Sequence, residues 1–119
     1  MKPIGIIIWT EKLSNLLSFY ELILNSKVHK LKNTSAYFIY NDFRIYISEH
    51  SEIFGNSKEP NRMIINLETD DIQSEYNRLI NLNINFIRKP EIEKWGGKVA
   101  TFEDPEKNRI NLIQQVDKI

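Results

Sequence analysis

The chain has 119 residues, 41% of them hydrophobic and 27% charged, and its sixteen basic and sixteen acidic side chains cancel. This composition predicts one compact domain, and a neutral chain without a basic stripe gives no reason to expect nucleic acid or a membrane as a partner. Cysteine is absent, which excludes disulfides, thiolate metal ligands and a cysteine nucleophile. The apolar run near the N-terminus is too short for a signal peptide or a membrane span, so we expect a cytoplasmic protein.

The first half of the chain predicts a strand, a helix and three further strands. The first strand is an apolar, β-branched run over residues 4–10. Apolar side chains then recur at helical spacing over residues 13–25. The next strands are expected over residues 28–32, 36–40 and 43–48, with Asn41-Asp42 as a short turn between the last two.

The second half repeats this order. A strand over residues 63–67 precedes a helix that starts after Asp70 and Asp71, where Gln73 is placed to complete a capping box with Asp70. An offset of 59 residues superposes the two starts, so each half is a βαβββ module and the whole is an internal repeat. The last three strands are expected over residues 83–88, 98–103 and 108–114.

Three local patterns accompany this repeat: Phe19-Tyr20 in the first helix, Trp95-Gly96-Gly97 before the penultimate strand, and Asp104-Pro105-Glu106-Lys107-Asn108 between the last two strands. Together they resemble the vicinal oxygen chelate superfamily, which includes glyoxalases, bleomycin resistance proteins and extradiol dioxygenases. In that superfamily's turn a glycine usually stands where this chain has Lys107. A left-handed backbone at this position would cost a lysine roughly 1 kcal/mol.

The resemblance implies an α+β fold in which two βαβββ modules form curved mixed sheets around a cavity. The 119 residues would then form a single glyoxalase-like domain, with module one over residues 1–48, a polar linker over 49–61 and module two over 62–119. Dimers are common in the superfamily, so the resemblance also implies a homodimer, for which exposed Trp9 or Phe54 would suit a two-fold interface.

Enzymes of this superfamily hold a divalent metal with histidine, histidine or glutamine, and glutamate. Carried over from Phe19-Tyr20 and from the final turn, these positions fall on Gly5, Ile64 and Asn111, with Tyr46 at the equivalent place in module one. Glycine and isoleucine have no side-chain donor, and asparagine is a weak neutral ligand. We therefore expect no divalent metal and no other cofactor.

Strand alternation predicts which side chains face the cavity. A two-residue turn at Asn41-Asp42 pairs Tyr37 with Tyr46 and Ile39 with Arg44 on that face. An apolar cleft with a few orienting polar groups is typical of a small-molecule site. The expected ligand-binding residues, three aromatic walls followed by five polar points, are Trp9, Tyr37, Tyr46, Arg44, Asn66, Glu68, Arg109 and Asn111. Each charged member has a simpler interpretation as a rim charge or a structural ion pair, and Trp9 as a core or interface residue.

These residues favour a metal-free protein that sequesters a small organic or aromatic compound, as bleomycin resistance proteins do. Against this interpretation, bleomycin resistance proteins resemble an acidic trap for cationic drugs, whereas this chain has no net charge. The alternative is an enzyme of the lyase, transferase or dioxygenase type with non-standard or no metal ligands, in which Tyr46 or Glu68 would act as acid or base. A third interpretation is a structural or regulatory domain whose cavity is filled by its own side chains.

Overall fold

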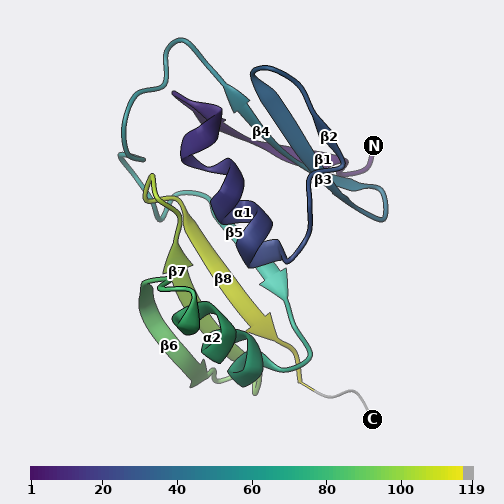
Figure 1. Cartoon of the computed structure of the whole chain (residues 1–119). Helices are drawn as coiled ribbons and strands as arrows, with labels where there is room; N and C mark the ends of the chain where they lie inside the picture. The colour runs from purple at the N-terminus through teal and green to yellow at the C-terminus, as the bar shows by residue number, and fades with distance from the viewer. Residues whose placement is uncertain (117–119) are drawn as a thin grey trace. The chain divides into compact units, whose positions relative to one another are not determined.

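Each half of the chain folds into a four-stranded mixed sheet with one helix, and the computed structural model describes residues 1–116 (Figure 1). The chain divides into two units, of which the first ends at Asn56 and the second begins at Ser57. The βαβββ order expected from the sequence is confirmed in both units. The last residues of the predicted second module, 117–119, lie outside the described part of the chain.

The first unit is built on a sheet of strand order β1-β4-β3-β2. Strand β1 runs parallel to β4, whereas β4, β3 and β2 form an antiparallel meander. Buried side chains from the helix and from alternate strand positions, among them Tyr20, Phe38 and Ile47, form its core. Its elements are β1 (Gly5–Thr10), a 3₁₀ turn η1 (Leu13–Asn15), α1 (Leu17–Leu24), β2 (Lys30–Leu31), β3 (Ser35–Tyr40) and β4 (Phe43–Glu49).

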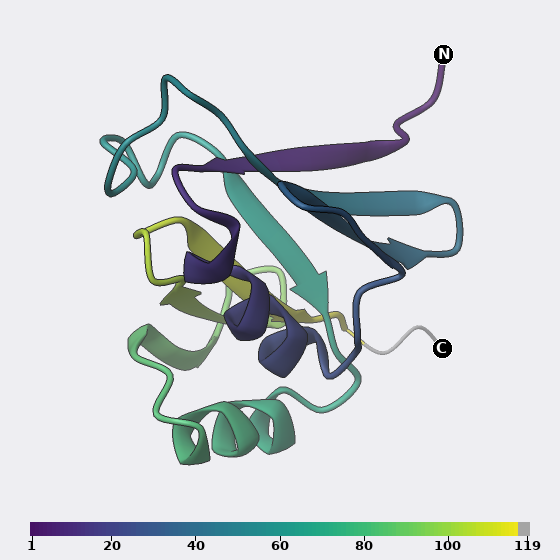
Figure 2. The same ribbon diagram turned by 45° about the horizontal axis from the view of Figure 1, so that its top comes forward.

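The second unit has the same topology, with strand order β5-β8-β7-β6 and β5 parallel to β8. Helix α2 packs against β6, β7 and β8, and Figure 2 shows it, in green, along one side of that sheet. Ile72 and Leu79 on the helix and Phe102 and Ile110 on the strands are fully buried. Its elements are β5 (Ile64–Glu68), α2 (Ile72–Asn81), β6 (Phe86–Ile92), β7 (Lys98–Glu103) and β8 (Arg109–Gln114).

The first helix is shorter than the sequence pattern predicts. No side chain caps its start, and the backbone passes through the 3₁₀ turn η1 before α1 begins at Leu17. The Glu49 carboxylate accepts a hydrogen bond from the Leu13 amide, at 2.9 Å, and so satisfies one donor of this turn. The helix ends at Leu24, and the C-cap residue Asn25 adopts the left-handed conformation (φ 48°) that asparagine tolerates.

The cap of α2 is Asp71 and not the predicted pair of Asp70 with Gln73. The Asp71 carboxylate accepts hydrogen bonds from the Ser74 amide and hydroxyl, whereas the Gln73 side chain bonds to Asn77. Ser74 is the third residue after Asp71, which is the position whose amide an N-cap side chain reaches. The Asp71 amide donates instead to Thr69 Oγ1, at 3.2 Å, so the reciprocal bond of a capping box is not made.

Strand β6 starts later and ends later than the predicted residues 83–88. Asn83 has a φ of 63° and belongs to the exit from α2, where the Ile84 amide still bonds to the Leu79 carbonyl. The strand then continues through Pro90 to Ile92, with its pairing to β7 interrupted between Arg88 and Glu91. Proline is tolerated there because β6 lies at the sheet edge and the register shifts at that point.

Among the described residues, no helix is both long and apolar enough to cross a membrane.

Candidate functional site

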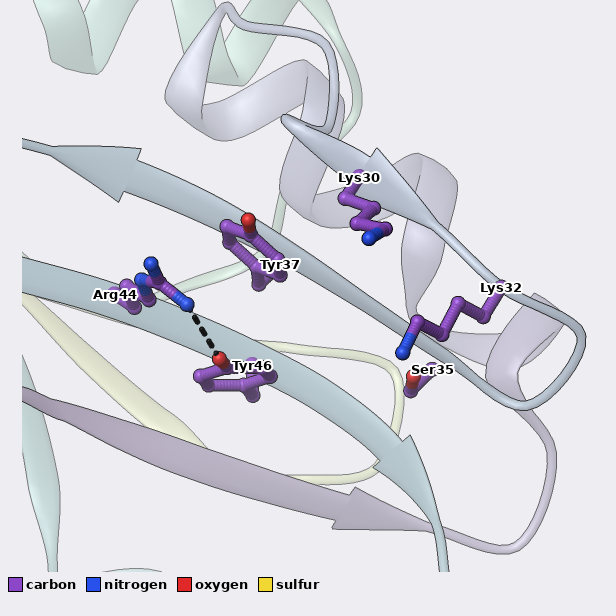
Figure 3. Close-up of a pocket in the computed structure, with 6 residues that line it drawn as sticks. All are labelled: Lys30, Lys32, Ser35, Tyr37, Arg44 and Tyr46. Atoms are coloured by element: carbon purple, nitrogen blue, oxygen red, sulfur yellow. Dashed lines mark hydrogen bonds between the residues drawn. The ribbon is translucent and has the colours of Figure 1, made fainter.

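The first unit carries a pocket of about 190 Å³ on its sheet (Figure 3). Strands β2, β3 and β4, together with Lys32 just after β2, provide the lining, which combines two phenol rings with three cationic side chains. The residues around it are Lys30, Lys32, Ser35, Tyr37, Arg44 and Tyr46.

Two short hairpin loops place these side chains on one face. Tyr37 pairs with Tyr46, and Ile39 with Arg44, across the two-residue loop at Asn41-Asp42, which confirms the predicted register. Asn41 has a φ of 53°, a conformation that suits asparagine in such loops. On the other side of β3, Tyr37 pairs with Lys30. Opposite residues in adjacent strands share a face, so the lysine, both tyrosines and the arginine are brought together.

The centre of the pocket is a contact among Tyr37, Arg44 and Tyr46. The two phenol rings lie 5.0 Å apart between centroids at an angle of 42°. Arg44 Nη1 donates a hydrogen bond of 3.0 Å to Tyr46 Oη, while its guanidinium carbon lies 4.7 Å from the centroid of the Tyr37 ring. The hydrogen bond to Tyr46 raises the pKa of Arg44 above its ordinary value. Arg44 is thus a permanent cation in a defined orientation.

Trp9, predicted as a third aromatic wall, does not line this pocket. Its indole packs edge-on against the His50 imidazole, with centroids 5.0 Å apart, and 42% of the residue remains exposed. Its role as a ligand platform therefore stays a prediction.

The other predicted polar points lie on the sheet of the second unit. Asn111 accepts a 2.7 Å hydrogen bond from the Thr101 hydroxyl and donates one of 3.0 Å to Asn66 Oδ1. Arg109 donates to Asn61 Oδ1 at 3.1 Å, and its Nε lies 3.8 Å from Glu103 Oε2. Glu68 is exposed at the end of β5. Asn111 and Arg109 thus have hydrogen-bond partners within the second unit. Ligand binding by the polar residues of this sheet stays a prediction.

Lys30, Lys32 and Ser35 line the pocket but were not predicted from the sequence. The Lys32 amide bonds to the Ser35 carbonyl at 2.8 Å, which closes the β2–β3 hairpin around residues 33 and 34. A two-residue loop at Asn33-Thr34, treated like the one at Asn41-Asp42, would have paired Lys30 with Tyr37. The signal was weak because β2 has only two residues, both exposed, and therefore no hydrophobic alternation.

The residues at the superfamily's metal positions do not fit a divalent cation. A Cβ atom at Gly5 would overlap the carbonyl oxygen of Arg44, so the position has no room for a side-chain ligand. Ile64 has no donor atom, and the amide oxygen of Asn111 is engaged by Thr101. Within residues 1–116, no three histidine, aspartate or glutamate side chains gather closely enough to hold a metal ion. A divalent site needs several good donors that converge on one point.

The family model of the glyoxalase-like domain matches residues 4–117 of this chain. A protein of Shewanella frigidimarina is 37% identical over 70 residues, which are 59% of this chain and 50% of that protein. The chain thus aligns with half the length of this curated relative.

Solved structures are similar over nearly the whole chain. A conserved domain protein superposes with a TM-score of 0.83 at 19% identity, covering 98% of this chain and all of its own. A glyoxalase/bleomycin resistance protein/dioxygenase family enzyme from Burkholderia phytofirmans superposes with a TM-score of 0.77 at 15% identity, covering 95% of this chain and 98% of that one. At such low identity these likenesses establish the fold alone.

Proposed function

This chain belongs to the glyoxalase-like domain family, and from that premise we propose that it is a metal-free protein that binds and sequesters a small organic or aromatic molecule. The resemblance to the vicinal oxygen chelate superfamily drawn from the sequence is confirmed by the same match and by the shared fold. Membership of the family does not by itself fix the activity, which depends on the residues of the site.

The observation that carries the proposal is the arrangement of Tyr37, Tyr46 and Arg44 around one pocket. Two tyrosine rings offer a flat, polarizable surface at a small entropic cost, and the arginine offers directed donors. The family's metal positions, in contrast, hold Gly5, Ile64 and Asn111, which supports binding without a metal.

The first test measures metal and ligand binding separately. Chelator-treated protein is assayed for metal content and for melting temperature with Ni²⁺, Co²⁺, Zn²⁺, Mn²⁺ and Fe²⁺ in turn. We expect no stoichiometric metal and no stabilisation, whereas a bound ion at a hundredfold excess over its dissociation constant would add about 2.7 kcal/mol to the free energy of unfolding. A stoichiometric, stabilising metal would overturn the metal-free proposal.

Ligand binding is then measured with single-ring aromatic compounds by calorimetry. Tyr37→Leu should abolish binding because it removes one wall of the pocket. Tyr40→Leu is the matched control, since Tyr40 lies on the same strand but does not line the pocket. Equal affinities of the two variants would contradict the assignment of the pocket.

The alternative function is an enzyme, favoured by one contact. The Tyr46 hydroxyl accepts a hydrogen bond from the Arg44 guanidinium, which fixes its orientation in the pocket, and a positioned hydroxyl is a group that can exchange a proton with a bound ligand. Tyr46→Phe keeps the ring but removes the hydroxyl. If the protein converts its ligand, this variant should retain binding and lose turnover. If the protein only sequesters its ligand, neither the parent protein nor Tyr46→Phe should form a product.

We also propose a homodimer, as the family resemblance implies. Trp9 and Phe54 are exposed by 42% and 66%, and large exposed apolar side chains are common at interfaces. Light scattering coupled to size exclusion should give twice the chain mass of 14.1 kDa. A species of only 14.1 kDa would contradict the dimer. The cytoplasmic location expected from the sequence stays a prediction.

A further inference from the structure

Positive charge is concentrated in the tyrosine-lined pocket of the first unit. Lys30, Lys32 and Arg44 make up half of its six lining residues, and none of the six is acidic. The chain as a whole has no net charge. The concentration is therefore a property of this site and not of the composition.

Arg44 differs from the other four arginines of the chain. Arg62, Arg78, Arg88 and Arg109 each have a glutamate oxygen within 4.0 Å. Within the described residues, Arg44, Lys30 and Lys32 have no such carboxylate partner, and the Arg44 side chain contacts two tyrosines instead. Three cations that share a pocket without a counter-charge repel one another and attract anions.

The geometry of Arg44 suits an anion with two oxygens. A guanidinium has five N–H donors in a planar fork, and among residues 1–116 the side-chain hydrogen-bond partner of Arg44 is Tyr46 Oη, bound by Nη1. The remaining donors can bind a carboxylate in a bidentate manner. Lys30 and Lys32 are two residues apart in an extended segment, so both side chains lie on the face of the pocket. Figure 3 shows them extending over it, beside Tyr37 and Ser35.

The size of the pocket limits the rest of the ligand. Its volume of about 190 Å³ is below the roughly 300 Å³ at which sites for drug-sized ligands begin. The tilted tyrosine rings offer a surface for a flat group. A single ring with one charged substituent fits both constraints.

We propose that this pocket selects a small, flat organic carboxylate, with Arg44 binding the carboxylate, the two lysines attracting it and the tyrosines contacting its ring. This inference rests on the proposed binding function and names its ligand class. A pocket of this kind would prefer anions, whereas an acidic trap for cationic drugs prefers cations.

The test compares three probes that share a ring and differ in charge: benzoate, benzamide and benzylamine, each titrated calorimetrically into the full chain. Benzoate should bind at least tenfold more tightly than benzamide, and benzylamine most weakly. Benzoate affinity should also fall when salt is raised from about 0.05 to about 0.5 M, because screening weakens the attraction. Equal affinities for benzoate and benzamide would overturn the anion inference while leaving the binding function intact. No binding of any probe at millimolar concentration would overturn both.

The lysines are tested with a double variant, Lys30→Gln with Lys32→Gln. Both residues are exposed, so the melting temperature should not change. Benzoate affinity should fall roughly tenfold, as expected for two partly screened charges, while benzamide affinity stays constant. Lys27→Gln is the matched control, because Lys27 lies in the same unit outside the pocket. An unchanged benzoate affinity in the double variant, or an equal loss in Lys27→Gln, would overturn the role of the two lysines.

Discussion

Gly5 pairs with Arg44 across the parallel strands β1 and β4 with no room for a side chain between them. The atom that a Cβ would meet is a backbone carbonyl oxygen, which cannot rotate away as the end of a side chain can. Position 5 is where the resemblance places a metal ligand of the superfamily's enzymes. The Arg44 carbonyl group fills the space that such a ligand would need, while the Arg44 side chain lines the pocket. The packing at Gly5 therefore leaves no space for a side-chain ligand at this position.

Gly5→Ala should therefore destabilise the first unit. The added methyl group forces β1 away from β4, and overpacking of this kind costs about 1–3 kcal/mol. Chemical denaturation should show the loss as a lower midpoint with an unchanged slope. Ile7→Ala is the control, because it lies in the same strand and Ile7 is half exposed. A denaturation curve of Gly5→Ala identical to that of the parent would show that the strands can separate at little cost.

Lys107 has a φ of 69°, so the residue that replaces the usual glycine of the final turn is held in the left-handed region. Lys107→Gly relieves this strain, of roughly 1 kcal/mol, but gives the unfolded chain more freedom. We expect a net gain in stability of up to about 0.5 kcal/mol. Lys107→Ala keeps the strain and removes the exposed ion pair to Glu103, and should not stabilise the protein. A gain with alanine equal to that with glycine would show that the backbone is not strained.

Tyr37, Arg44 and Tyr46 could be placed on one face from the sequence because the loop length fixes the register of a hairpin. Their surroundings could not be placed in the same way. Alternation assigns a side chain to a face but does not say that the Trp9 indole packs against His50. Lys30 was overlooked, since a two-residue strand carries no periodic signal.

Element ends were the least predictable feature of the fold. Asn83 and Ile84 have the composition of a strand start, yet they satisfy the carbonyls at the end of α2. Pro90 argues against a strand interior but is accommodated where the β6–β7 pairing shifts. The turn at Asn83 depends on a left-handed backbone that the alternation of side chains does not reveal. The placement of Pro90 depends on the pairing with β7, which a local window of sequence does not contain.

Asp104 organises the final turn and is only 3% exposed. Its carboxylate accepts hydrogen bonds from the Glu106 amide, the Asn108 amide and the Asn108 side chain, at 2.8–3.0 Å. Asp104→Ala leaves these donors without their acceptor and should lower the free energy of unfolding by about 2–3 kcal/mol. Asp42→Ala, at an exposed hairpin loop, should change it by less than about 0.5 kcal/mol. Similar losses in the two variants, measured by urea denaturation, would contradict the organising role of Asp104.

Asp71 gives the second unit a pH-dependent contribution to stability. Hydrogen bonds from the amide and hydroxyl of Ser74 hold the pKa of this N-cap carboxyl below its ordinary value. A carboxyl whose pKa is lower in the folded than in the unfolded state stabilises the fold above about pH 4, and this contribution is lost as the pH falls through the folded pKa. Asp71→Ala should therefore melt a few degrees below the parent at about pH 7.

The difference between the parent and Asp71→Ala should narrow as the pH is lowered from about 5 to about 2, because protonation removes the charge that the cap uses. Asp70→Ala is the matched control, since Asp70 is the exposed neighbour and the N-cap is Asp71. Its melting temperature should follow that of the parent at each pH. A constant difference for Asp71→Ala across this range would show that the cap acts through hydrogen bonding alone and that the ionisation of Asp71 does not contribute to folding.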